Sequence, residues 1–66
     1  MTVAKTIEIS SESTKSFEDA IQTGIKRAEK SLNNVKGAWI AEQKVTVESG
    51  NIVNYRVIMR VTFVLE

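Results

Sequence analysis

The side chains that could carry out catalysis are serines near the N-terminus and a pair of adjacent carboxylates. Ser10, Ser11 and Ser13 would need a general base beside them, and the chain has no histidine and no cysteine. Glu18 and Asp19 are neighbours in sequence, so on a helix their carboxylates point in different directions and cannot act together on one substrate. We therefore predict that the protein is not an enzyme.

Length and charge limit the partners of this chain. It has 66 residues, with nine Lys and Arg against eight Asp and Glu, and this balance does not favour a nucleic-acid-binding surface. No apolar run approaches the ~18 residues of a membrane span, and the first five residues lack the apolar core of a signal peptide. We expect a single cytoplasmic domain, residues 1–66, that binds neither nucleic acid nor a membrane.

The C-terminal half predicts a long β-hairpin that would position most of the remaining side chains. Its strands are Val35–Glu48 and Ile52–Glu66, joined by a turn at residues 48–51. One face of the second strand is apolar, and the intervening positions are mostly polar, which predicts one buried face. The apolar set is Val53, Tyr55, Val57, Met59, Val61, Phe63 and Leu65, and the intervening set is Asn54, Arg56, Ile58, Arg60, Thr62 and Val64.

The N-terminal half predicts a short strand and one helix. Val3–Ser10 alternates weakly as a strand does, and residues 11–15 are polar and typical of a connection. Ser16 is a predicted helix N-cap, and apolar residues then recur at three- and four-residue spacing as far as Leu32. Gly24 inside this helix indicates a close approach to the sheet. The order strand, helix, strand, strand predicts an α+β protein in which a three-stranded antiparallel sheet is wrapped around one helix.

The predicted helix is too short to cover the predicted sheet. A helix ending at Leu32 is roughly 25 Å long, whereas each long strand runs about 45 Å. Odd positions of the strand Val35–Glu48 would share one face, and near residues 37–41 both faces are apolar or small. An uncovered apolar face favours association. We therefore expect a homo-oligomer with closed symmetry.

Several stretches together resemble the dodecin family. They are Ser16-Phe17-Glu18-Asp19-Ala20, Lys26-Arg27-Ala28, Val35-Lys36-Gly37-Ala38, Glu42-Gln43, Ser49-Gly50, Tyr55-Arg56-Val57 and Val61-Thr62-Phe63-Val64-Leu65-Glu66. The similarity spans nearly the whole chain in order. It implies a β-α-β-β protomer and a hollow homododecamer with threefold and twofold contacts that binds or stores a small molecule.

The resemblance also suggests where a ligand would bind. Flavin-binding dodecins stack isoalloxazine rings on a tryptophan early in the second strand and hydrogen-bond the ring edge with a glutamine of the third strand. Gly37 and Arg56 match these two positions, so we expect binding of FMN, FAD or riboflavin to be weakened or lost. Trp39 would either stack a ligand from a displaced position or fill the space left by Gly37. The predicted binding residues are Gly37, Ala38, Trp39 and Arg56.

Two questions about this surface stay open at the level of sequence. Arg56 would pair either with a phosphate or carboxylate of a ligand or with a glutamate such as Glu42. The resemblance is also close to the calcium dodecins, which implies a flavin-free shell that binds calcium or has a purely structural role. Calcium takes about six to eight oxygen ligands. Because Glu42, Glu48 and Glu66 are dispersed, such a site would form between subunits, and its ligands are unassigned.

Overall fold

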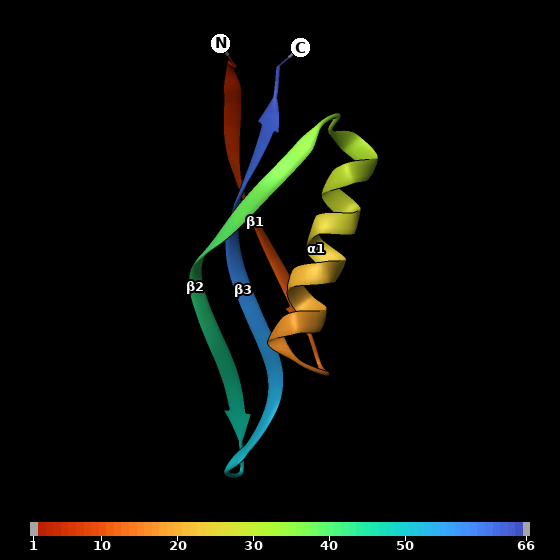
Figure 1. Cartoon of the computed structure of the whole chain (residues 1–66). Helices are drawn as coiled ribbons and strands as arrows, with labels where there is room; N and C mark the ends of the chain where they lie inside the picture. Colours follow the sequence, from red (N-terminus) through yellow and green to blue (C-terminus); the bar gives the residue numbers. More distant parts are fainter. Residues whose placement is uncertain (1, 66) are drawn as a thin grey trace.

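The computed structural model describes residues 2–65 and confirms the predicted order of elements. These are β1 (Ala4–Ser13), α1 (Phe17–Ser31), β2 (Val35–Glu48) and β3 (Asn51–Val64). In Figure 1 the helix lies across one face of a twisted sheet. β1 extends three residues beyond the predicted end at Ser10, and β3 stops at Val64 rather than at Glu66, which lies outside the described residues.

The sheet has β3 at its centre, and both of its neighbours are antiparallel. The predicted alternation of β3 is confirmed in its middle, where Val57, Met59 and Val61 are fully buried against Ala20 of α1. The side chains of β3 that lie between these three point to the opposite face of the sheet. We call that opposite side the outer face.

The start of α1 is tied to the end of β1 by hydrogen bonds. Ser16 caps the helix, because its Oγ accepts a hydrogen bond of 2.9 Å from the backbone N–H of Asp19. The buried Ser13 hydroxyl donates to Asp19 Oδ2 over 2.7 Å and accepts from the backbone N–H of Lys15 over 2.9 Å. Ser13 therefore serves as both the last residue of β1 and part of the helix entry. The connection predicted at residues 11–15 is wrong for residues 11–13, which belong to β1, and is confirmed for residues 14–15.

Gly24 is a point of close approach between α1 and the sheet. A Cβ at this position would lie 2.5 Å from Cε of Met59 and 3.0 Å from Cβ of Ser11. A larger residue at this position would have to displace Met59 and Ser11. Close packing of α1 on the sheet therefore requires glycine here, despite its cost of about 1 kcal/mol in a helix. The predicted reason for this glycine is confirmed.

β2 does not keep the single alternation that the sequence predicts. Its pairing with β3 shifts between Val35 and Gly37, between Ile40 and Glu42, and near Thr46. Each shift is a β-bulge or irregularity, which bends the strand and changes which face the next residue occupies. Val35 and Ile40 consequently both pack against the core, although one position is odd and the other even. Figure 1 shows β2 bending sharply near its middle.

The β2–β3 turn has two residues with left-handed backbone. Ser49 has φ of 52° and Gly50 has φ of 79°, which is the geometry of a type I′ hairpin turn. This turn matches the right-handed twist of the two strands that it joins.

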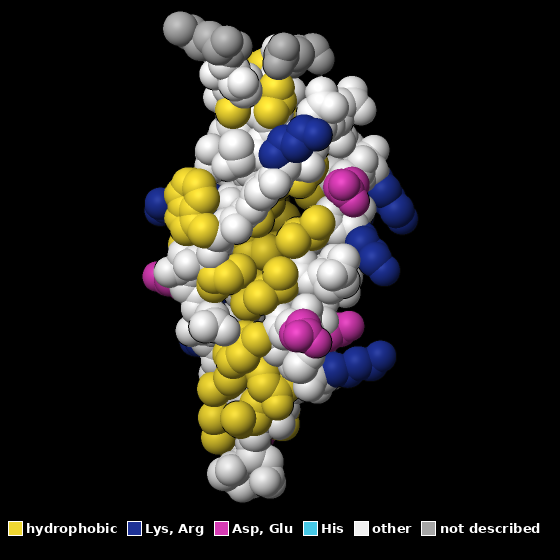
Figure 2. Space-filling model, in the orientation of Figure 1, with side chains coloured by type: hydrophobic (Ala, Val, Ile, Leu, Met, Phe, Trp, Pro, Cys, Tyr) yellow, Lys and Arg dark blue, Asp and Glu magenta, His cyan; other side chains and the backbone are white. Residues whose placement is uncertain are grey.

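The far end of the hairpin extends beyond the helix. The described chain measures 51 × 19 × 13 Å. The N-terminal end of α1 is the end nearer the β2–β3 turn, and it lies well short of that turn (Figure 1). Val47 and Ile52 are 55% and 51% exposed, and Val53 is also exposed. Figure 2 shows apolar side chains continuing past α1 toward the hairpin tip. The expected mismatch in length between helix and sheet is present in the protomer.

Among residues 2–65, no helix is both long enough and apolar enough to cross a bilayer.

Candidate ligand surface on the outer sheet face

The outer face of the sheet carries ladders of polar and charged side chains. Glu12 lies opposite Arg56, Glu8 opposite Arg60, and Thr6 opposite Thr62, each pairing a residue of β1 with one of β3. On the other side of β3, Trp39 of β2 lies opposite Arg60. Antiparallel pairing brings such cross-strand side chains within reach of one another.

Arg56 is held by a carboxylate with two partners. Its Nη2 lies 3.0 Å from Oε2 of Glu12, while Oε1 of Glu12 accepts a hydrogen bond of 2.6 Å from Nδ2 of Asn54. Hydrogen bonds from Asn54 and then Arg56, with the positive charge of Arg56, lower the pKa of Glu12. Arg56 thus has an ion-pair partner, and that partner is Glu12 rather than Glu42, which lies opposite Ile58.

Arg60 lies beside an aromatic ring and has a longer ion pair than Arg56. Its guanidinium carbon is 5.8 Å from the centroid of Trp39, within the range of a cation–π contact. Its Nε donates to Oε2 of Glu8 over 3.4 Å, which is at the long limit for such a bond. Trp39 is 50% exposed, so its indole is accessible on the outer face of the protomer.

The four predicted binding residues are only partly brought together. Gly37, Trp39 and Arg56 share the outer face, but Ala38 lies opposite the buried Val61 and so belongs to the other face. A Cβ at Gly37 would meet no atom within 4 Å, so the space beside Trp39 is open. Trp39 therefore does not fill the volume above Gly37 within the protomer.

Sequence reasoning did not single out Arg60 or Glu8 as binding residues. Arg60 belongs to the intervening, mostly polar set of the last strand, and this alternation correctly predicts the face of the sheet on which it lies. Its contact with Trp39 depends on the register between β2 and β3, and the bulges in β2 set that register. No local pattern in the sequence reveals those bulges.

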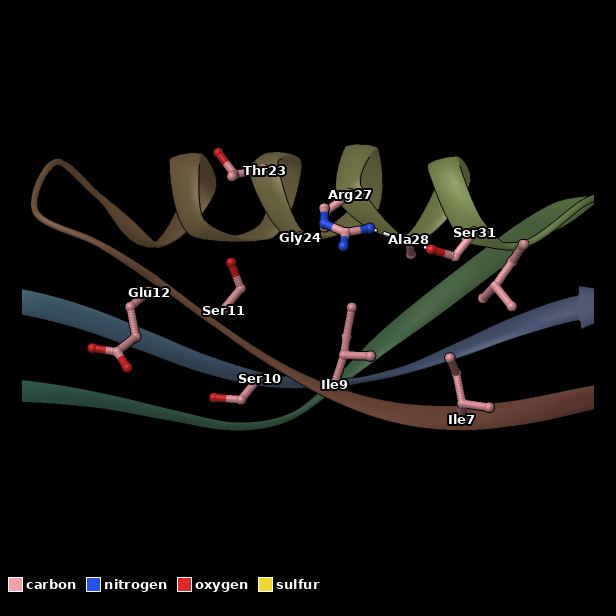
Figure 3. A pocket seen from close by; sticks show the side chains of 11 residues that line it. Ile7, Ile9, Ser10, Ser11, Glu12, Thr23, Gly24, Arg27, Ala28 and Ser31 are labelled. Carbon is pink, nitrogen blue, oxygen red and sulfur yellow. Dashed lines mark hydrogen bonds between the residues drawn. The ribbon is translucent and has the colours of Figure 1, made fainter.

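A groove also runs between α1 and β1 and encloses about 590 Å³. Ile7, Ile9, Ala28 and Leu32 contribute apolar lining, and Arg27 donates a hydrogen bond of 3.2 Å to Ser31 Oγ. In Figure 3, Ile9 and Ser11 point from β1 toward the helix, whereas Ser10 points away.

Within residues 2–65, no group of three or more Asp, Glu, His or Cys side chains is placed to hold a metal ion.

A helix laid on a twisted, three-stranded antiparallel sheet of order β1-β3-β2 defines a small α+β protein with a β-α-β-β protomer. The dodecin family model matches residues 3–66, and the chain belongs to the dodecin family. It is 33% identical over 63 residues to the calcium dodecin of Mycobacterium tuberculosis (strain ATCC 25618 / H37Rv), covering 96% of this chain and 89% of the relative.

Solved structures share the fold over nearly the full length. A point mutant of the Thermus thermophilus dodecin superposes with a TM-score of 0.93 at 30% identity, covering 100% of this chain and 98% of its own. Dodecin from Streptomyces davaonensis gives 0.91 at 28% identity, covering 98% and 96%. The M. tuberculosis calcium dodecin, described as calcium chelating with a novel calcium-binding site, gives 0.82 at 33% identity, covering 98% and 93%.

Proposed function

We propose that this chain forms a non-catalytic, closed homododecamer that binds or stores a small planar molecule between subunits on the outer sheet face. The observation that carries the proposal is the half-exposed indole of Trp39 beside the open space at Gly37. An exposed aromatic ring next to open space suits stacking of a planar ligand.

The proposal of an assembly rests on the uncovered end of the hairpin. Val47 and Ile52 oppose each other in the register, and both are more than half exposed. A long strand end with exposed apolar side chains is stabilised when another copy covers it. Membership of the dodecin family supports twelve copies with threefold and twofold contacts.

The ligand surface consists of Gly37, Trp39 and Arg56, with Ala38 contributing backbone between the first two. Flavins such as FMN, FAD and riboflavin fit its planar character. Gly37 offers no aromatic face and Arg56 donates but accepts no hydrogen bonds, so flavin affinity is lower here than with tryptophan and glutamine at these positions.

The second candidate function is a flavin-free shell that binds calcium or has a structural role. It is supported by the 33% identity to a protein named calcium dodecin. Because no acidic cluster exists within residues 2–65 of one protomer, calcium ligands would come from more than one copy.

Fluorescence titration of the assembled protein separates the two functions. Under the first, added flavin quenches the fluorescence of Trp39, the single tryptophan, and flavin emission falls with a fixed stoichiometry. Under the second, flavin causes no quenching and millimolar calcium raises the thermal unfolding midpoint. The second pattern would contradict the proposal of a planar ligand.

A further inference from the structure

We infer that Arg60, rather than Arg56, recognises the charge of the ligand, and that Trp39 and Arg60 together select planar molecules carrying a phosphate or carboxylate. This inference rests on the proposed function, because it specifies the ligand class of the same surface. It moves the polar part of the site four residues along β3, from Arg56 to Arg60, toward the C-terminal end of the strand.

The two side chains form one continuous surface. Trp39 and Arg60 are direct cross-strand partners, and the guanidinium carbon lies 5.8 Å from the ring centroid. A planar ligand stacked on the exposed indole would therefore have its edge close to this cation. Along β2, Gly37 and Trp39 are about 6.6 Å apart, and the open space at Gly37 extends the platform.

Arg56 is less suited to the same task. Along β3 it is four residues from Arg60, about 13 Å away in an extended strand. Its ion pair with Glu12 measures 3.0 Å, and Asn54 fixes that carboxylate from its other oxygen. A ligand anion at Arg56 would have to displace a carboxylate that already has two hydrogen-bond donors.

Arg60 can exchange its partner more easily. Its ion pair with Glu8 has a distance of 3.4 Å, against 3.0 Å for the pair of Arg56 with Glu12. Both pairs are about half exposed, so they differ in this distance and in the second donor that Asn54 supplies to Glu12. Exposed ion pairs of this kind are weak. An arginine already beside an aromatic ring can pair a phosphate or carboxylate through its planar fork of donors. Glu8 competes with the ligand for Arg60, so removing its charge strengthens anion binding.

FMN and riboflavin are matched probes, because they share the isoalloxazine ring and differ in the phosphate. Titrations of the assembled protein follow flavin quenching and Trp39 fluorescence. We expect the wild type to bind FMN about tenfold more tightly than riboflavin, the size of one charge-assisted hydrogen bond. Arg60→Gln removes this preference and leaves riboflavin affinity nearly unchanged. Glu8→Gln increases the preference for FMN.

Two further variants control the result. Lys26→Gln removes the same charge from an exposed position of α1 and keeps the preference for FMN. Arg56→Gln is the competing variant: it changes the affinity for FMN and riboflavin alike, and loss of the preference in that variant but not in Arg60→Gln overturns the inference. Equal binding of both flavins to the wild type overturns the inference alone, whereas no binding of either flavin overturns the proposed function as well.

Discussion

Glu12 links the outer face to the pH dependence of stability. Hydrogen bonds from Asn54 and Arg56 lower its pKa below the ordinary value of 4.5. The unfolded chain therefore binds a proton at higher pH than the folded chain, and stability is lost as the pH falls from about 4.5 through the folded-state pKa. Above that range the contribution is fully present.

We expect Glu12→Gln to be less stable than the wild type at pH 7 and to lose that difference as the pH falls well below 4.5. Urea unfolding at one chain concentration measures both proteins at each pH. Glu29→Gln, at an exposed position of α1, is the control for the loss of one negative charge. A gap between Glu12→Gln and the wild type that stays constant from pH 7 to pH 3 would show that this carboxylate is not coupled to folding.

Substitutions at Gly37 and Arg56 are expected to increase the affinity for flavin. A Cβ at Gly37 would meet no atom of the protomer within 4 Å, and Gly37→Trp combined with Arg56→Gln is expected to raise flavin affinity. One added stacking contact contributes about 0.5–1.5 kcal/mol, roughly a two- to tenfold gain. Fluorescence titration with FMN measures it, with each single variant as the control. No gain in the double variant would show that the pocket between subunits differs in shape from those of flavin-binding dodecins.

At the scale of elements, the sequence predicts best where a pattern is regular. The alternation through Val57, Met59 and Val61 and the cap at Ser16 are local signals, and both are confirmed. The loop predicted at residues 11–13 is wrong because these polar side chains belong to a strand: Glu12 lies on the solvated outer face, whereas Ser11 and Ser13 face α1. Ser13 and Glu12 have partners on α1 and β3, and no local pattern reports such contacts.

At the site on the outer face too, contacts between strands that are distant in sequence could not be predicted from a local pattern. Three of the four predicted binding residues do share a face, since a strand alternates locally between its bulges. The partner of Arg56 and the contact between Arg60 and Trp39 depend on pairing between strands distant in sequence. Bulges change that pairing by one residue each, so residues opposite one another could not be read from spacing alone.

The hairpin turn provides a prediction at this scale. Type I′ turns favour Asn-Gly, because both central residues need positive φ. Ser49→Asn is expected to stabilise the folded protein by about 0.5 kcal/mol, and Gly50→Ala, at φ of 79°, to destabilise it by about 1 kcal/mol. Urea unfolding of both variants at equal chain concentration measures the two shifts. Equal effects of the two substitutions would contradict the assigned turn.

At the scale of the whole molecule, the exposed end of the hairpin makes Ile52 a test of assembly. A glutamate there introduces charge where we propose that a second copy packs, so Ile52→Glu is expected to reduce the assembly to smaller species. The side chain is 51% exposed in the protomer, so the fold itself tolerates the change. Ile52→Val keeps an apolar side chain and is expected to stay assembled. Size-exclusion chromatography gives the sizes, and circular dichroism confirms that both variants are folded.

The central claim is that a sheet longer than its helix is completed by other copies of the same chain. Sedimentation equilibrium of the purified wild type at micromolar concentration tests it most directly. Twelve chains of 7.4 kDa give about 89 kDa, and this is the mass that we predict. A stable, folded species of 7.4 kDa under these conditions would contradict the claim.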